Sequence, residues 1–237
     1  MTETISLGDI VIRITRKAVR NVHLSVHPPE GDVTLVAPVN TRLDVARAYA
    51  ISKLGWIRER RQELQDQARE TPRQFISRES HYVWGRRYVL EVKHKDAKPS
   101  VLLQPKKIIL SVRPGTEAIK RAEIMYAWHR KLLHDLIPPL IQKWEAKLNV
   151  KVNAYYLQRM KTKWGSCTAQ ARNIRLNTEL VKKPKDLVEY VLVHEMVHLI
   201  EPTHSERFVA LLNQHCPGWR EARAELNELP LGAEAWL

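Results

Sequence analysis

Hydrophobic and polar residues alternate along much of the first 115 residues, a pattern typical of β-strands with one buried face. In residues 5–37 the alternation predicts three short antiparallel strands, with a Pro/Gly turn at 28–32. Asn40 or Thr41 can then cap a helix that continues to about residue 68.

The alternation returns between Phe75 and Val112, after a stretch with no clear period. It predicts four more strands, at 82–84, 87–92, 101–103 and 107–112. Pro114 and Gly115 close this segment. We therefore expect a boundary near residue 115, with a β-rich basic region at 1–115 and a second domain at 116–237, and leave open whether the two pack as one unit.

The second half has a helical period. A long amphipathic helix is expected from Thr116–Glu117 to Ile137, and Pro138–Pro139 should kink or restart it before 140–148. Two or three strands joined by a Gly-containing turn are expected between Val150 and Asn177. Three shorter helices follow, so the pattern predicts an α+β fold in which a small antiparallel sheet lies beside a helix at 184–200.

The charge is unevenly distributed along the 237 residues, whose formal net charge is +13. Residues 180–237 contain six Lys/Arg against nine Asp/Glu, a net charge of −3, which leaves 33 against 17 and a net charge of +16 in residues 1–179. Such an excess fits either an anionic partner, such as nucleic acid or nucleotide phosphate, or a solvated basic surface without a specific partner.

The chain shows no sign of secretion or membrane insertion. Residues 1–6 lack the basic start and apolar core of a signal peptide, and no apolar run approaches the roughly 18 residues that span a bilayer. Cys167 and Cys216 are the only cysteines and do not form a C-x-x-C pair, so a disulfide framework is not indicated. We expect a cytoplasmic protein without a membrane partner.

The candidate chemistry lies in the apolar helix around His194-Glu195-Met196-Val197-His198. Residues four apart in a helix differ in direction by only about 40° around its axis. The side chains of His194 and His198 therefore lie on the same face and can bind one metal ion. Glu195 is then placed to reach a water at the ion without being a ligand, which is how H-E-x-x-H works as a hydrolytic site. The alternative is a buried helix with two satisfied histidines, but an apolar helix would then carry two imidazoles and a carboxylate at a cost.

A third metal ligand is expected from His204. Glu201–Pro202 should end the metal helix and let the chain turn back. Thr203 to Glu206 has the form of a capping box, which predicts that His204 lies in the first turn of a new helix. A helix start disfavours the imidazolium, and metal binding needs the neutral ring.

A basic cluster precedes the metal helix and could face it. Its side chains could contact an anionic group or an oxyanion. The alternative is a solvated edge strand whose charged side chains prevent pairing with another strand. The candidate substrate contacts in this region are Arg159, Lys161, Lys163, Trp164, Ser166, Arg175 and Asn177.

These two regions together resemble the YgjP-like zinc metallopeptidase family, which is related to the WLM and SprT-like zincins. The resemblance rests on Trp164-Gly-Ser-Cys, Ile174-Arg-Leu-Asn, Tyr190 to His198 and His204 to Phe208. One departure is Val209, where many members carry Trp. The resemblance implies a zincin-like α+β catalytic domain that binds Zn²⁺ through His194, His198 and His204, with Glu195 as general base. It also implies two further possibilities: WLM relatives are linked to proteolysis of protein crosslinked to DNA, and UTP pyrophosphatase activity has been attributed to the family.

The sequence therefore favours a zinc-dependent hydrolase that cleaves a peptide or protein, with the substrate extended along Ile174 to Asn177. A second hypothesis keeps the metal and takes a nucleoside triphosphate as substrate, with Arg159, Lys161, Lys163 and Arg175 on the phosphates. A third is a nucleic-acid-associated protein that binds through the basic N-terminal part. Its metal would be structural, and Cys167 or a nearby Glu would be the fourth ligand.

Overall fold

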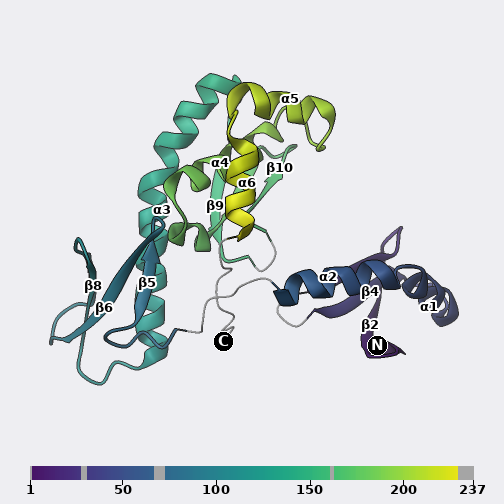
Figure 1. The fold of residues 1–237 in the computed structure, drawn as a ribbon, viewed down its shortest axis with the longest axis horizontal. Helices are drawn as coiled ribbons and strands as arrows, with labels where there is room; N and C mark the ends of the chain where they lie inside the picture. Colours follow the sequence, from purple (N-terminus) through teal and green to yellow (C-terminus); the bar gives the residue numbers. More distant parts are fainter. Residues whose placement is uncertain (1, 28–30, 67–72, 161–162, 229–237) are drawn as a thin grey trace. The chain divides into compact units, whose positions relative to one another are not determined.

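The computed structural model describes residues 2–27, 31–66, 73–160 and 163–228 (Figure 1). The contacts within the chain divide it into two compact units, residues 1–69 and residues 70–235. The strands between Ser80 and Val112 belong to the second unit, together with the helices that follow, whereas the sequence pattern placed a boundary near 115.

The first unit begins with a four-stranded sheet. Its strands are β1 (Thr2–Leu7), β2 (Ile10–Lys17), β3 (His23–His27) and β4 (Asp32–Pro38), in the order β1-β2-β4-β3. The sequence predicted three antiparallel strands, but β2 and β4 run parallel and a tight turn at Gly8 separates β1 from β2. Gly8 and Asp9 are both exposed and break the alternation between the two strands, a signal that the sequence reading passed over.

Two helices cover this sheet, α1 (Leu43–Ser52) and α2 (Leu54–Asp66), where the sequence predicted one. They are interrupted only at Lys53, whose backbone leaves the helical region. Ala50 and Ile57 from the helices are fully buried together with Ile12 and Leu35 of the sheet. The first unit therefore has a hydrophobic core of its own.

The second unit contains another four-stranded sheet, and here the four predicted strands are present. They are β5 (Ser80–Val83), β6 (Arg86–His94), β7 (Ser100–Leu103) and β8 (Lys107–Val112), in the order β5-β6-β8-β7. Alternate residues such as Leu90, Ile108 and Leu110 are buried against Met125 of the long helix α3 (Ala118–Leu148).

Helix α3 runs without interruption for 31 residues, through both prolines. The expected restart at Pro138–Pro139 was wrong, because the helix is continuous across both prolines. Both prolines lie on the exposed side of the helix, so the carbonyl groups that lose a hydrogen-bond donor face solvent. Leu133, Ile137 and Ile141, on either side of the prolines, are buried in one hydrophobic core, which stabilises the helix across them.

The remaining elements surround the candidate chemistry. A three-stranded sheet contains β9 (Ala154–Gln158), β10 (Gly165–Thr168) and β11 (Asn173–Asn177), in the order β10-β11-β9. A short 3-10 helix, η1 (Thr178–Lys182), leads to α4 (Lys185–Val197), α5 (Glu206–His215) and α6 (Trp219–Glu228). The sheet lies beside α4 as expected (Figure 1). It is mixed rather than antiparallel, because β9 pairs parallel with β11. The architecture is α+β, which confirms the predicted fold class.

The turn between β5 and β6 holds the start of helix α4. The backbone N–H of Trp84 donates to the carbonyl of Val181 at 2.8 Å, and that of Gly85 donates to Lys182 at 3.1 Å. Gly85 has φ +75°, and a Cβ atom there would lie 2.7 Å from Cγ of Pro184. The close approach that only glycine allows thus fixes the residue directly before α4.

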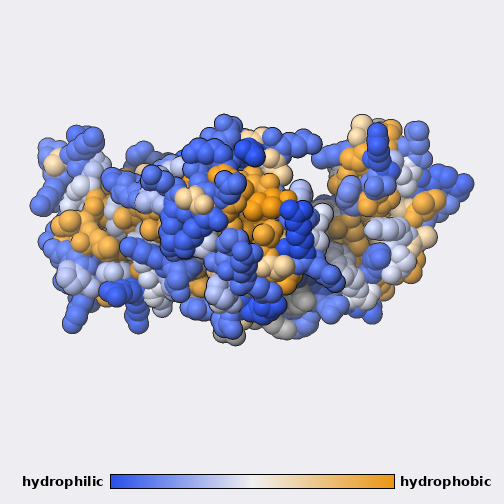
Figure 2. Space-filling model, turned by 90° about the horizontal axis from the view of Figure 1, so that it is seen from above, coloured by the Kyte–Doolittle hydropathy of each residue, from blue (hydrophilic) through white to orange (hydrophobic). Residues whose placement is uncertain are grey.

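The surface is mainly hydrophilic on the face shown in Figure 2. Hydrophilic residues cover most of the face shown in Figure 2, with hydrophobic residues in smaller patches between them. The segment 80–113 contains eight Lys/Arg against two Asp/Glu, so the β5–β8 region carries a large share of the basic excess. No helix in the described part of the chain is both long and apolar enough to cross a membrane.

Candidate active site

Helix α4 and the loop that follows it bring three imidazoles together. His194 lies in the last turn of α4, His198 is the residue that caps its C-terminal end, and His204 precedes α5. One ligand nitrogen of each ring lies within 4.8 Å of those of the other two. The Nε2 atoms of His194 and His204 are 3.1 Å apart.

The loop between the two helices differs from the prediction at its end. Ser205, not Thr203, is the N-cap of α5, and its hydroxyl accepts from the backbone N–H of Phe208 at 3.3 Å. The expected position of His204 in the first turn was therefore wrong, because His204 lies just outside the helix. Thr203 is instead bound by its Oγ1 to the carboxylate of Glu201 at 2.7 Å. This contact closes the loop and turns His204 back toward α4.

The loop also selects the ligand nitrogen of His198. Its Nδ1 lies 3.1 Å from the backbone carbonyl oxygen of Glu201. A carbonyl can only accept a hydrogen bond, so Nδ1 carries the proton and Nε2 keeps its lone pair. The Nδ1 atom of His194 is buried and has no hydrogen-bond partner among the described residues.

A buried aromatic ring supports all three imidazoles. The ring centroid of Phe208 lies 5.0, 4.6 and 4.8 Å from the centroids of His194, His198 and His204. Phe208 is only 2% exposed and belongs to the main core of this unit. The packing restricts the rotamers of the rings and ties their position to the core.

The donor set fits a zinc ion. Burial lowers the pKa of His194 to about 4 and also lowers that of His198, so both rings are neutral near pH 7, as ligands must be. A tetrahedral ion with bonds of ~2.0–2.1 Å holds its donor atoms roughly 3.3 Å apart. The 3.1 Å between the Nε2 atoms of His194 and His204 is close to that separation.

Glu195 points from the same helix toward β10 and is only 6% exposed. Burial raises the pKa of its carboxyl group to about 7, and the positive charge of Lys163 opposes the shift. A carboxyl group with this pKa can both take up and release a proton near neutral pH. Gly165 makes room for it, because a Cβ atom at this position would lie 2.6 Å from Oε1 of Glu195.

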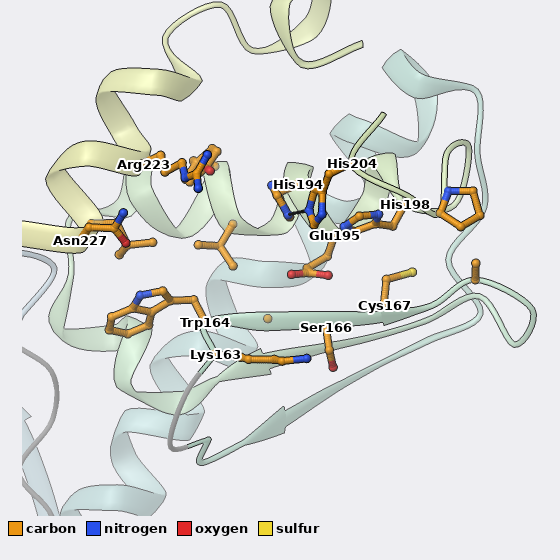
Figure 3. A pocket seen from close by; sticks show the side chains of 16 residues that line it. Lys163, Trp164, Ser166, Cys167, His194, Glu195, His198, His204, Arg223 and Asn227 are labelled. Atoms are coloured by element: carbon orange, nitrogen blue, oxygen red, sulfur yellow. Dashed lines mark hydrogen bonds between the residues drawn. The ribbon is translucent and has the colours of Figure 1, made fainter. Parts of the chain in front are cut away.

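A pocket of about 580 Å³ opens onto the three histidines and Glu195 (Figure 3). One wall is formed by Gly165, Ser166 and Cys167 of β10, and another by residues of α6. The thiol of Cys167 has its pKa raised to about 11, mainly by burial and also by the charge of Glu195. Among the described residues, the group whose ligand atoms lie close enough together to hold a metal ion comprises the three histidines and does not include Cys167.

The candidate substrate contacts are distributed over several places. Lys163, Trp164 and Ser166 line the pocket. Arg159 instead lines a separate cavity, where its guanidinium lies 5.1 Å from the ring centroid of Tyr126 and near Glu179. Arg175 contacts Thr168 and the ring of Tyr156. Lys161 falls outside the described residues.

Asn177 is buried and holds neighbouring backbone. Its Nδ2 donates to the carbonyls of Met160 and Lys163 at 2.8 and 2.9 Å, and its Oδ1 accepts from the backbone N–H of Glu179 at 3.1 Å. It therefore anchors the loop that brings Lys163 to the pocket.

The sequence reasoning missed the contribution of α6. Arg223 and Asn227 lie four residues apart on this helix and both line the pocket, as does Tyr190 of α4. The spacing shows that Arg223 and Asn227 share a face of the helix, but nothing in the sequence shows that this face meets α4.

Comparison with known proteins agrees with the resemblance seen in the sequence. The family model for the YgjP-like metallopeptidase domain matches residues 20–229. None of the curated proteins compared with the chain matches it. Among solved structures, the zymogen of Pyrococcus abyssi abylysin is 19% identical with a TM-score of 0.35, and the match covers 37% of this chain and 89% of that one. The zymogen of Methanocaldococcus jannaschii jannalysin is 21% identical with a TM-score of 0.34, covering 38% and 87%. Because the family model spans most of its length, this chain belongs to the YgjP-like metallopeptidase family.

Proposed function

We propose that the protein is a zinc-dependent peptidase in which His194, His198 and His204 hold the ion and Glu195 is the general base. Membership of a metallopeptidase family supports a metal-dependent peptidase. The observation that carries the finer assignment is the convergence of three imidazole nitrogens within 4.8 Å, next to a buried carboxyl group whose pKa is about 7.

Zinc at this position would supply Lewis acidity to a peptide carbonyl and to water. Glu195 would carry out the two proton transfers of the reaction. A carboxylate oxygen of Glu195 takes a proton from the attacking water, and the carboxyl group then gives it to the nitrogen of the leaving amine. The raised pKa favours both transfers near neutral pH, because neither protonation state is strongly preferred.

A different strand from the one expected from the sequence is better suited to pair with the backbone of a peptide substrate. The sequence placed an extended peptide along Ile174 to Asn177, which is β11. That strand is paired on both sides, by β10 and by β9, and cannot accept another strand. Strand β10 is the outermost of its sheet and three of its residues line the pocket. A peptide is therefore better placed beside β10, where main-chain hydrogen bonds would align it.

The nucleoside triphosphate alternative loses support from the geometry. It needed several cations on the phosphates, but Arg159 and Arg175 contact other parts of the fold, and Lys163 is the one described member of that set that lines the pocket. Binding of nucleic acid through the basic N-terminal part stays a prediction from charge.

Replacement of Glu195 by Gln tests the proposal. The amide keeps the shape of the side chain but cannot accept the proton, so hydrolysis of peptides should fall by about 10²-fold or more while zinc stays bound. Zinc content is measured by mass spectrometry and turnover with a pool of quenched peptides. Glu225→Gln, an exposed change on α6, is the control and should keep both.

Two results would contradict the proposal. One is a Glu195→Gln protein with full turnover, which would remove the general base. The other is zinc-loaded wild-type protein that releases pyrophosphate from UTP and cleaves no peptide.

A further inference from the structure

Two positively charged side chains line the pocket, against one acidic side chain. Lys163, just before β10, and Arg223, on α6, approach the pocket from two different walls (Figure 3). Glu195 is the one acidic residue among the described lining residues, and it is buried beside the histidines. Among the described residues, neither the Lys163 ammonium nor the Arg223 guanidinium has a hydrogen-bond or ion-pair partner within bonding distance.

The packing of α6 directs Arg223 into the pocket. Trp219, Ala222 and Leu226 pack on the hydrophobic core that includes α4. With one face of α6 fixed in this way, Arg223 and Asn227 share the neighbouring face and line the pocket together.

Apolar side chains also line this part of the pocket. Trp164, Val191 and Leu226 contribute to its lining. Apolar walls with a single guanidinium suit a peptide side chain that ends in one carboxylate, since the methylene groups pack on the walls and the carboxylate meets the fork of the arginine.

We propose that this pocket selects peptides with a carboxylate next to the cleaved bond and that Arg223 is the residue that recognises it. The carboxylate belongs either to an acidic side chain or to the C-terminus of the peptide. The inference rests on the proposed peptidase function and deepens it by naming the class of substrate.

Matched peptides test the charge preference. Quenched peptides that differ only by Glu against Gln are scanned over the positions on both sides of the cleaved bond, and a second series compares a free C-terminus with an amide. We expect kcat/KM to favour the acidic member by about tenfold or more at one position, mainly through KM. The series that responds identifies the source of the carboxylate.

Variants of α6 assign the preference to Arg223. Arg223→Gln should cleave the two members of each pair equally, and Arg223→Glu should favour Lys at the responsive position. Arg220→Gln is the matched control, because Arg220 lies one turn away and binds Oδ1 of Asn213 at 2.8 Å instead of lining the pocket. It should retain the preference of the wild type.

A binding measurement separates this inference from the peptidase proposal. The Glu195→Gln protein is titrated with the same peptides and binding is followed by fluorescence anisotropy. If the wild type cleaves acidic and amide peptides equally, the inference is overturned and the peptidase proposal stands. If the wild type cleaves none, tighter binding of acidic peptides that Arg223→Gln abolishes still supports the inference, whereas equal binding or none overturns it.

Discussion

The position of the Glu195 carboxylate depends on the absence of a side chain at Gly165. Glu195 is buried, and its carboxylate fills the volume that a side chain at Gly165 would occupy. The sequence showed the motif that contains Glu195 and the Trp-Gly-Ser-Cys segment that contains Gly165, but not that the two touch. Contacts between distant segments follow from tertiary packing, which short motifs do not encode.

Gly165→Ala should therefore reduce activity without loss of metal. The new methyl group would displace the carboxylate of Glu195, and a shift of about 1 Å can cost about 10²-fold in rate. Turnover and zinc content of the variant measure the effect. Gly55→Ala is the control, since a Cβ atom there meets nothing within 4 Å. Wild-type turnover in Gly165→Ala would show that the close approach does not position Glu195.

The four residues of the proposed centre could be named from the sequence, and the structure brings them together. The residues around them could not be named as well. Lys163 lines the pocket as expected, but Arg159 and Arg175 contact Tyr126 and Tyr156. Arg223 was missed because its helix is short and follows the motif with no signal of its own.

The elements place the site through the ends of helices and turns. The start of α4 is held by the turn at Trp84–Gly85, whose backbone donates to Val181 and Lys182. The end of α4 is held by the loop at Glu201, which also selects the ligand nitrogen of His198. The β5–β8 sheet thus contributes to the site without supplying a ligand.

Gly85→Ala should destabilise the second unit by more than positive φ alone explains. The methyl group would strain the backbone at φ +75° and also collide with Pro184. Gly115→Ala is a matched control, since it has φ +79° and open space around its Cβ position. We expect Gly85→Ala to cost about 1–3 kcal/mol more than Gly115→Ala in urea unfolding. Equal costs would mean that this turn does not hold the start of α4.

Prediction of elements succeeded where the hydrophobic period was clear. The four strands of β5–β8 and the start of α3 follow the pattern of buried residues. It failed where local signals competed with packing. The prolines in α3 are tolerated on its exposed side, and β9 joins its sheet in parallel, which alternation does not show.

The whole molecule consists of two units, each with its own hydrophobic core. The sequence placed a boundary near 115 because the composition changes there from strands to a helix. Contacts between α3 and the β5–β8 sheet join these segments, and a pattern read along the chain does not report such contacts.

Acid stability of the second unit should depend on His129. This residue of α3 is 4% exposed, and burial lowers its pKa to about 3, with Lys182 adding to the effect. Between an unfolded pKa of about 6.5 and the folded pKa, the unfolded chain binds a proton that the folded chain does not, so stability falls as pH falls through this window. His129→Gln cannot take up this proton and should lose less stability between pH 7 and pH 4 in urea unfolding. An equal loss in both proteins would show that His129 titrates normally.

X-ray absorption at the zinc edge tests the central claim most directly. For zinc-loaded wild-type protein we predict nitrogen donors from three imidazoles at about 2.0–2.1 Å and no sulfur shell near 2.3 Å. His204→Ala should remove one imidazole from the spectrum. A sulfur donor, a spectrum that His204→Ala leaves unchanged, or protein that binds no zinc after reconstitution would contradict a three-histidine centre.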